Sequence, residues 1–319
     1  MMAKILCGVL LALCGWAAHA QGFPSREIRS ICNFAPGSGA DIVVRFYSDR
    51  LARLAGRPVI VDNRPGANGT IATAELARAA PDGHTIMITP ASSTIAAVPY
   101  LYKSLPFDPA KDFAAVTTIA SLSFVIAVDA ARPIRSIPDL VAALKQRPGD
   151  GFYGTSNNTG VIAAELFKTK AGLNTTYAPY KANAQALTDL LQGQLDFISY
   201  DATWAVPQHR AGRIRILAAT AVKRSVALPE VPTLTEVGYG GDDVTPWWGV
   251  VVPAATPVPL VEKLSAWINQ ITADEDTRQF LARAAFDPMP GSPAQMQALL
   301  ASDAGRWKRY LELARIQPQ

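Results

Sequence analysis

Apolar positions along the chain follow two alternating spacings. Short runs rich in β-branched or aromatic residues predict strands at Ile28–Phe34, Pro58–Asp62, Thr85–Thr89, Phe124–Val128, Gly151–Gly154, Leu195–Tyr200, Ile214–Thr220 and Trp248–Val252. Between them, apolar residues recur at helical spacing and predict helices at Asp41–Leu54, Ile71–Ala79, Leu140–Gln146, Val161–Ala171 and Gln185–Leu191. This alternation favours parallel sheets wound with helices on both faces, so we expect an α/β fold.

The pattern also suggests how the chain divides. Two proline-containing stretches, Ala131–Pro138 and Ser225–Pro232, frame a block that restarts the strand–loop–helix pattern. We therefore expect a discontinuous lobe 1 from residues 21–123 and 227–319, and an inserted lobe 2 from residues 124–226. Two crossover strands would join these doubly wound lobes around a cleft that can close.

The first twenty residues have the form of a signal peptide. Lys4 supplies positive charge, Ile5–Trp16 is a short apolar core, and Ala18-His19-Ala20 has the small-x-small pattern of a cleavage site. The apolar stretch is shorter than a membrane-spanning helix needs. A lipid anchor at Cys14 is the less favoured alternative, because the preceding residue is not small. We expect cleavage after about Ala20 and a periplasmic location.

Composition and charge narrow the range of expected binding partners. The chain has 30 Lys and Arg against 26 Asp and Glu, without a basic block, so nucleic acid is not an expected partner. After cleavage Cys32 is the one cysteine left, and we expect it to be a buried apolar residue in a strand. We expect a monomer that needs no cofactor.

A glycine-rich loop follows the first predicted strand. Pro36-Gly37-Ser38-Gly39-Ala40 lies between the carboxyl end of that strand and the start of a helix. Ligands of open α/β sheets bind at such ends, and the bare N–H groups of a helix start attract anions. Asp41 is a candidate N-cap of the helix.

A second loop of the same design lies in the expected lobe 2. Gly154–Gly160 is rich in small hydrogen-bonding residues and again leads from a strand into a helix. One such loop per lobe predicts a clamp that holds an anion with N–H and hydroxyl donors. Arg64–Thr70 also opens a helix, but it lacks the Lys-Ser/Thr pair of a nucleotide loop and is interpreted as structural. Ser92, Ser93 and Thr94 add hydroxyls after another strand.

Catalytic chemistry is poorly supported. Ser38 lies in G-S-G and not in the G-x-S-x-G pattern of a nucleophile elbow. His84 and His209 are interpreted as surface histidines, and no His, Cys, Asp or Glu residues have metal-ligand spacing. Asp196 and Asp201 are five residues apart across a strand, which suits neither a catalytic dyad nor a metal site. We therefore expect no enzyme, no catalytic residue and no metal.

Several motifs resemble a known family. F-A-P-G-S-G-A-D-I-V-V-R, V-D-N-R-P-G-A-N-G-T, A-A-P-D-G-H-T, A-P-Y-K and W-W-G-V-V-V-P-A-A-T-P are similar, in this order, to the tripartite tricarboxylate transporter receptors, also called Bug receptors. The resemblance implies a type II periplasmic binding protein that captures a small carboxylate for a membrane transporter. It also implies that Phe34 to Asp41 and Thr155 to Gly160 grip the carboxylate through backbone N–H groups and ordered water.

Departures from the family pattern bear on the ligand. Ala40, Gly160-Val161, Tyr200-Asp201 and Ile95 stand where many members have Thr, Ser-His, Asp-Asn and His. A pocket walled by Phe34, Val161, Tyr200 and Trp248 would favour an aromatic mono- or dicarboxylate over citrate-like acids. The alternative is that these side chains pack on the protein and do not touch the ligand.

The expected ligand-binding residues come from both loops and from two further strand ends. They are Phe34, Ala35, Pro36, Gly37, Ser38, Gly39, Ala40, Asp41, Ser92, Ser93, Thr155, Ser156, Asn157, Asn158, Thr159, Gly160, Val161, Tyr200 and Asp201. Two rival functions stay open at this point. One is the extracytoplasmic ligand sensor of a two-component system, and the remoter one is a secreted serine hydrolase that uses Ser38.

Overall fold

The computed structural model describes residues 22–241, 244–314 and 316–318, so the expected signal peptide lies outside the described residues. The chain forms two compact units. Unit 1 comprises the chain as far as Ile119, together with Trp248–Asp274 and Pro290–Ala304. Unit 2 comprises Ala120–Trp247, Glu275–Met289 and the chain from Gly305 onward. Residues 120–123, 227–247, 275–289 and 305–319 thus group with unit 2, whereas the sequence assigned them to lobe 1, and the lobe boundaries stay a prediction.

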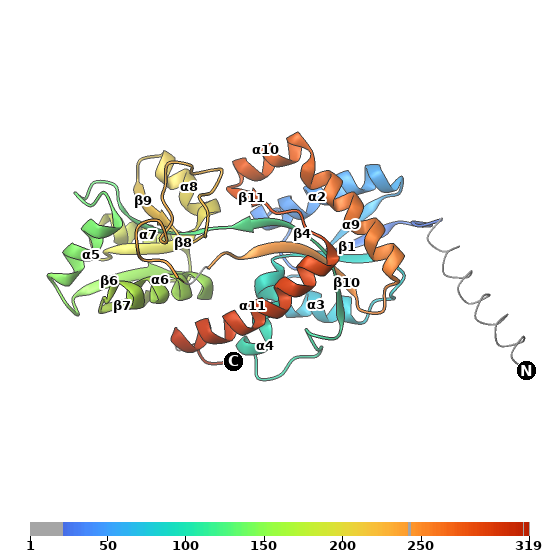
Figure 1. The fold of residues 1–319 in the computed structure, drawn as a ribbon, viewed down its shortest axis with the longest axis horizontal. Coiled ribbons are helices and arrows are strands. Elements are labelled where there is room, and N and C mark those ends of the chain that lie inside the picture. The colour runs from blue at the N-terminus through green and yellow to red at the C-terminus, as the bar shows by residue number, and fades with distance from the viewer. Residues whose placement is uncertain (1–21, 242–243, 315, 319) are drawn as a thin grey trace, which may run out of the picture. The chain divides into compact units, whose positions relative to one another are not determined.

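A six-stranded sheet contains β1 (Ile28–Cys32), β2 (Val59–Asn63), β3 (Thr85–Thr89), β4 (Phe113–Leu122), β10 (Trp247–Pro253) and β11 (Phe286–Pro288). Its strand order is β11-β4-β10-β3-β1-β2. Figure 1 labels β1, β4, β10 and β11 of this sheet. β1 pairs in parallel with β2 and β3, with Cys32 opposite Asn63, whereas β10 runs antiparallel to β3. The carboxyl ends of β1 and β2 therefore meet at one edge of the sheet.

The second sheet lies in unit 2. It contains β5 (Phe124–Asp129), β6 (Gly151–Thr155), β7 (Thr175–Pro179), β8 (Phe197–Asp201) and β9 (Ile214–Ala219), in the order β7-β6-β8-β5-β9. β6 is parallel to β7 and β8, while β5 is antiparallel to β8 and β9. Both sheets are thus mixed, where the sequence predicted parallel ones.

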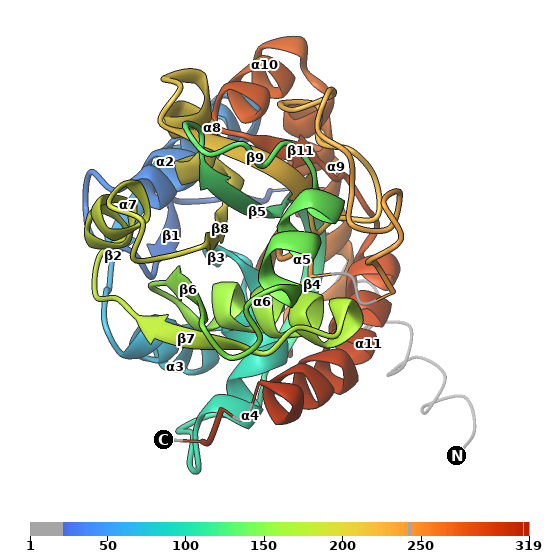
Figure 2. The same ribbon diagram turned by 90° about the vertical axis from the view of Figure 1, so that its left-hand side faces the viewer.

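Helices cover both faces of the unit 2 sheet. Apolar side chains of α5 (Ile137–Lys145) and α6 (Asn158–Ala171) pack with Tyr153 and Phe197 on one face. Those of α7 (Asn183–Leu191) and α8 (Ala202–Arg210) pack with the strands on the other face (Figure 2). The doubly wound α/β fold expected from the sequence is confirmed.

The remaining helices complete the two units. They are α2 (Gly39–Ala55), α3 (Thr70–Ala77), α4 (Val98–Leu101), α9 (Val258–Ala273), α10 (Glu275–Arg283) and α11 (Pro293–Leu313), with short helical turns η1 (Ala67–Gly69) and η2 (Ser92–Ala97). In unit 1, α2 is fastened to α9 by the buried Tyr47 hydroxyl, which lies 3.1 Å from Thr272 Oγ1. α2 and α3 each begin directly after a loop at the carboxyl edge of the parallel strands, which places their first turns there.

Candidate functional site

In unit 1, the β1–α2 loop (Asn33–Ser38) ends at an N-cap. Ser38 has extended backbone angles, and its hydroxyl accepts a hydrogen bond from the N–H of Asp41 at 3.2 Å. Helical bonding begins at Ile42, whose N–H donates to the Ser38 carbonyl at 3.0 Å. The N–H groups of Gly39 and Ala40 come before this bond, where a helix presents bare donors. The predicted N-cap, Asp41, is therefore wrong: Ser38 caps the helix, which begins two residues earlier than expected.

The buried Asp41 side chain supports the β1–α2 loop. Its buried carboxylate accepts hydrogen bonds from Gly37 N–H (2.8 Å), Arg45 Nε (2.8 Å) and Asn63 Nδ2 (2.7 Å). Burial would raise its pKa, but these donors outweigh burial and lower the pKa to about 2. Gly37, at φ 79°, donates its N–H to this carboxylate and not outward. Asp41 is thus a charged support of the loop.

Phe34 lies at the start of this loop against an aromatic partner. Its partly exposed ring stacks on Trp248, with centroids 5.5 Å apart and planes 17° apart. Asn63 Nδ2 also donates to the Phe34 carbonyl at 2.9 Å, while Ala35 and Pro36 are exposed. Asn63 therefore bonds both to the start of the loop and to Asp41 in the first turn of α2. Sequence reasoning missed it, although its place at the end of the strand beside β1 is a usable signal.

The neighbouring loops of unit 1 bond among themselves. The buried Thr89 hydroxyl donates to Asn33 Oδ1 (3.1 Å) and lies 3.0 Å from Thr94 Oγ1, and the Ser93 hydroxyl donates to the Pro90 carbonyl (3.1 Å). Ser92 is buried in the η2 turn. A Cβ on Gly69 would lie 2.8 Å from Asn33 Nδ2, which places the Arg64–Thr70 loop next to the β1–α2 loop. These contacts give the loops after β2 and β3 a structural role beside the β1–α2 loop.

In unit 2, the β6–α6 loop (Ser156–Asn157) has a similar ending. Asn157 is the N-cap, and its side chain accepts from the Gly160 N–H at 2.8 Å. Helical bonding begins at Val161, whose N–H donates to the Asn157 carbonyl at 3.1 Å. The N–H groups of Asn158 and Thr159 precede it and are placed as those of Gly39 and Ala40 are in unit 1. The helix begins at Asn158, three residues before the predicted start.

Gly160 is required by a close approach between α6 and the sheet. A Cβ there would lie 2.0 Å from Thr155 Oγ1 and 2.6 Å from the Ser199 carbonyl oxygen. The hydroxyls of Thr155 and Ser199 are fully buried and have no hydrogen-bond partner within the described residues. Buried hydroxyls normally bond to protein or to ordered water, so these two point to a missing partner. The Ser156 hydroxyl bonds to Asn183, a second residue that sequence reasoning missed.

The proposed wall residues of unit 2 pack within the unit. Val161 is 6% exposed, and Tyr200 is fully buried with its ring 4.7 Å from that of Trp204. Burial raises the pKa of Tyr200 to about 12. The Asp201 side chain caps α8 by accepting from the Trp204 N–H at 3.0 Å. These contacts agree with the alternative that Val161, Tyr200 and Asp201 pack on the protein and do not touch the ligand.

The remaining candidate residues are the two histidines and Cys32. His84 is buried against Phe23 with ring centroids 5.0 Å apart, so its surface assignment was wrong. His209 is partly buried and lies 3.1 Å from the Ile214 carbonyl. Cys32 is buried in β1, as expected. Within the described ranges, no three His, Cys, Asp or Glu residues are grouped as a metal site would require.

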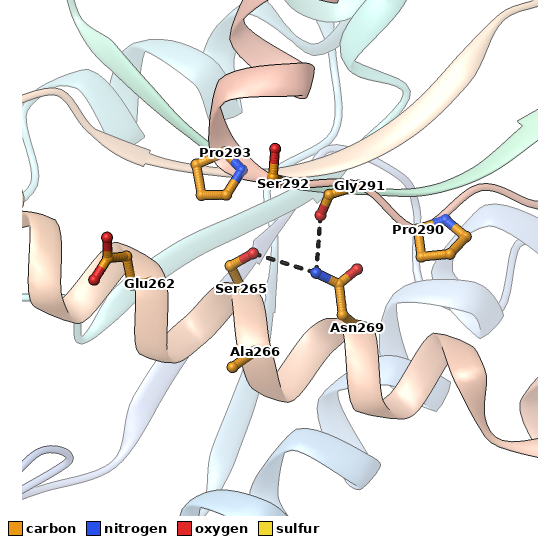
Figure 3. A pocket seen from close by; sticks show the side chains of 8 residues that line it. All are labelled: Glu262, Ser265, Ala266, Asn269, Pro290, Gly291, Ser292 and Pro293. Carbon is orange, nitrogen blue, oxygen red and sulfur yellow. Dashed lines mark hydrogen bonds between the residues drawn. The ribbon is translucent and has the colours of Figure 1, made fainter.

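A surface groove of about 480 Å³ lies in unit 1 between α9 and the start of α11 (Figure 3). Asn269 Nδ2 donates to the Gly291 carbonyl at 2.8 Å and to Ser265 Oγ at 3.3 Å, so these polar groups bond to one another. The Thr117 hydroxyl also donates to the Gly291 carbonyl, at 2.6 Å. These bonds fix the turn that precedes α11, which is a structural role.

Solved structures of similar proteins place this fold in a class. An R. palustris protein solved with adipate is 32% identical, with a TM-score of 0.78, and the match covers 93% of this chain and 100% of that one. MatC from Rhodopseudomonas palustris, solved with bound malate, is 25% identical with a TM-score of 0.71 and covers 91% and 100%. The fold is a two-lobed, type II-like binding-protein fold.

Sequence comparison identifies the family. Residues 43–315 match the model of the tripartite tricarboxylate transporter family receptor. Protein BugT of Bordetella pertussis is 30% identical over 94% of this chain and 93% of its own length. The chain belongs to this receptor family, whose members are periplasmic receptors, so it is a solute-binding receptor and not an enzyme. The serine hydrolase alternative is thereby excluded, and the Ser38 hydroxyl serves as a helix cap.

Among the described helices, not one has the length and apolar character that a bilayer crossing needs.

Proposed function

We propose that this protein captures a small carboxylate in the periplasm and delivers it to the membrane subunits of a tripartite tricarboxylate-type transporter. One observation carries the proposal: each unit contains a capped helix start whose first two N–H groups lie ahead of the helical bonds. Such groups bind anions through their partial positive charge. Similar proteins solved with adipate and with malate support a carboxylate as the anion.

The ligand donors we propose are backbone groups more than side chains. In unit 1 they are the N–H groups of Gly39 and Ala40, with the Asp41 carboxylate holding the loop in shape. In unit 2 they are the N–H groups of Asn158 and Thr159, with hydroxyls of Thr155 and Ser156 beside them. A hydrogen bond to a charged group contributes about 1.5–3 kcal/mol, so each donor should matter measurably.

Proline substitution offers a direct test, because it removes a backbone N–H. Gly39 and Asn158 are the first residues of their helices, where proline is tolerated, and the preceding residues Ser38 and Asn157 have the extended conformation that proline favours. We expect Gly39→Pro and Asn158→Pro each to weaken carboxylate binding about tenfold or more. The matched controls are Gly39→Ala and Asn158→Ala, which keep the N–H. Equal affinities of the proline and alanine variants would contradict the proposal.

The body of the ligand is a finer proposal. The Phe34–Trp248 stack provides an apolar surface directly beside the β1–α2 loop, which favours an acid with a flat or apolar body. Val161 and Tyr200 no longer support this idea, because they are buried. Calorimetry with benzoate, adipate and citrate tests it. Phe34→Ala should weaken benzoate binding more than citrate binding, and tight binding of citrate alone would remove the aromatic proposal.

A thermal-shift screen across organic acids would identify the ligand. A ligand that binds only the folded protein at 100 times its Kd stabilises the fold by about 2.7 kcal/mol, which a melting curve resolves easily. We also propose cleavage after about Ala20 and a monomeric receptor. The N-terminal sequence of the exported protein and its mass in solution test these two points. A dimer would contradict the second.

A further inference from the structure

A lysine stands beside the β6–α6 loop in unit 2. Lys181 lies in the β7–α7 connection, between two residues that contact the strand and loop preceding α6. The N–H of Tyr180 donates to the Thr155 carbonyl at 3.2 Å, and Asn183 Oδ1 accepts from the Ser156 hydroxyl. β7 pairs in parallel with β6, with Pro179 opposite Thr155. Lys181 is exposed, and the flexible stem of a lysine lets its ammonium reach neighbouring groups.

The surroundings of Lys181 are already electropositive. α6 begins beside it, and α7 begins two residues after it at Asn183. The N-cap of α7 is Ala182, whose side chain cannot accept a hydrogen bond. The first N–H groups of α7 therefore have no side-chain cap. A cation near helix N-termini is unfavourable by itself. A lysine in this place therefore gains from an anionic partner.

The protein does not supply that partner within the described residues. Asp189 of the adjoining helix α7 is engaged elsewhere, because it accepts from the Tyr180 hydroxyl at 2.6 Å. In unit 1, by contrast, Arg45 and Arg64 at the loops form ion pairs with Asp41, Asp62 and Glu75. The ammonium of Lys181 thus differs from the arginines of unit 1 in having no such pair in the described ranges.

An orphan hydroxyl points to a ligand at the same edge. Thr155 Oγ1 is fully buried, has no partner within the described residues, and faces Gly160 in the first turn of α6. A ligand oxygen, or a water that it orders, would satisfy this hydroxyl. The hydroxyl, the helix start of α6 and Lys181 therefore suit a negatively charged group.

From this geometry we infer that Lys181 selects ligands that carry two negative charges. The inference rests on the proposed function: backbone donors bind one carboxylate, and the ammonium of Lys181 compensates the charge of a second. The protein should therefore prefer a dicarboxylate to a monocarboxylate of the same shape.

Matched probes separate charge from shape. Adipate and monomethyl adipate have the same carbon chain, as do terephthalate and its monomethyl ester, but each ester carries one charge less. We expect the wild-type protein to bind the dianion of a pair at least about tenfold more tightly than the ester. Lys181→Gln should remove most of this preference by weakening dianion binding, and should leave ester binding within about twofold. The preference should also shrink as salt concentration rises.

The control is Lys145→Gln. Lys145 is an exposed lysine in the last turn of α5, which precedes β6 and so lies at the opposite edge of the same sheet. A dianion-to-ester ratio that is unchanged in Lys181→Gln, or reduced equally in Lys145→Gln, would overturn the inference while leaving the proposed function intact. Failure of the wild-type protein to bind any carboxylate would overturn the proposed function, and the inference with it.

Discussion

The two helix-start loops have a similar ending but different support. In unit 1 a buried carboxylate with a low pKa, Asp41, holds the loop through Gly37, Arg45 and Asn63. In unit 2 the loop has no comparable buried charge, and a neutral cap, Asn157, is followed by a tight contact between Gly160 and the sheet. Bare helix-start donors can thus be presented by two different means, one electrostatic and one steric. The two means should respond differently to substitution.

The largest effect should come from removing the buried charge of unit 1. Asp41→Ala removes the acceptor of the Gly37 N–H and the ion-pair partner of Arg45, and should destabilise the protein by about 3 kcal/mol. Urea denaturation measures the loss. The control is Asp49→Ala, which removes an exposed carboxylate from the same helix and should cost little. Similar losses in both variants would show that Asp41 does not support the loop.

The second effect tests the steric support of unit 2. Gly160→Ala places a Cβ against Thr155 and the β8 backbone, and should cost about 2 kcal/mol and weaken ligand binding. Gly39→Ala is the matched change in unit 1, where nothing lies within 4 Å of the new Cβ. Its melting temperature should stay close to that of the wild type. If both variants melt alike, the proposed difference between the loops is wrong.

The third effect is a pH dependence specific to unit 1. The folded-state pKa of Asp41, about 2, is below the usual unfolded value near 3.9. The stabilisation is therefore complete above about pH 5 and is lost as the pH falls through 3.9 toward 2. It amounts to about 2 to 3 kcal/mol. The difference in unfolding free energy between wild type and Asp41→Asn should shrink over this range. A constant difference would contradict the charge assignment.

The smallest effect compares the two caps. Ser38→Ala and Asn157→Ala each remove a side-chain acceptor at a helix start, which usually costs about 1 kcal/mol. We expect Asn157→Ala to cost more than Ser38→Ala, because in unit 1 Asp41 still holds the loop. Melting curves of the two single variants decide the order. A larger loss for Ser38→Ala would mean that the cap, and not the carboxylate, dominates in unit 1.

Much of the fold could be predicted from the chain, because its strands are short apolar runs between turn residues. All eight expected strands are present, but β4, β7 and β11 were not expected. The polar residues in Thr175–Pro179 hide β7, and β11 has only three residues. Both loops were found because a glycine-rich turn before a helix is a local pattern.

The orientation of site residues was harder to predict. Ser38 and Asp41 are both capping residue types three positions apart, and the bonds that Arg45 and Asn63 make to Asp41 decide their roles. Tyr200 lies in a strand that is buried on both faces, so the alternation of apolar and polar residues does not tell which face each side chain occupies. Whether the expected residues bind ligand stays a prediction.

The position of β10 in the six-stranded sheet has a consequence for biosynthesis. β10 separates β3 from β4 in strand order, and its Gly249 pairs with Thr89, which precedes it by 160 residues. A nascent chain cannot pair β3 with β10 until Pro253 has emerged, and pairing of such distant strands is slow. Because of this delay the chain stays unfolded for longer. That helps a translocation machinery, which must thread the polypeptide before it becomes compact. A shortened gene that ends before β10 should yield an aggregation-prone fragment with an open sheet edge.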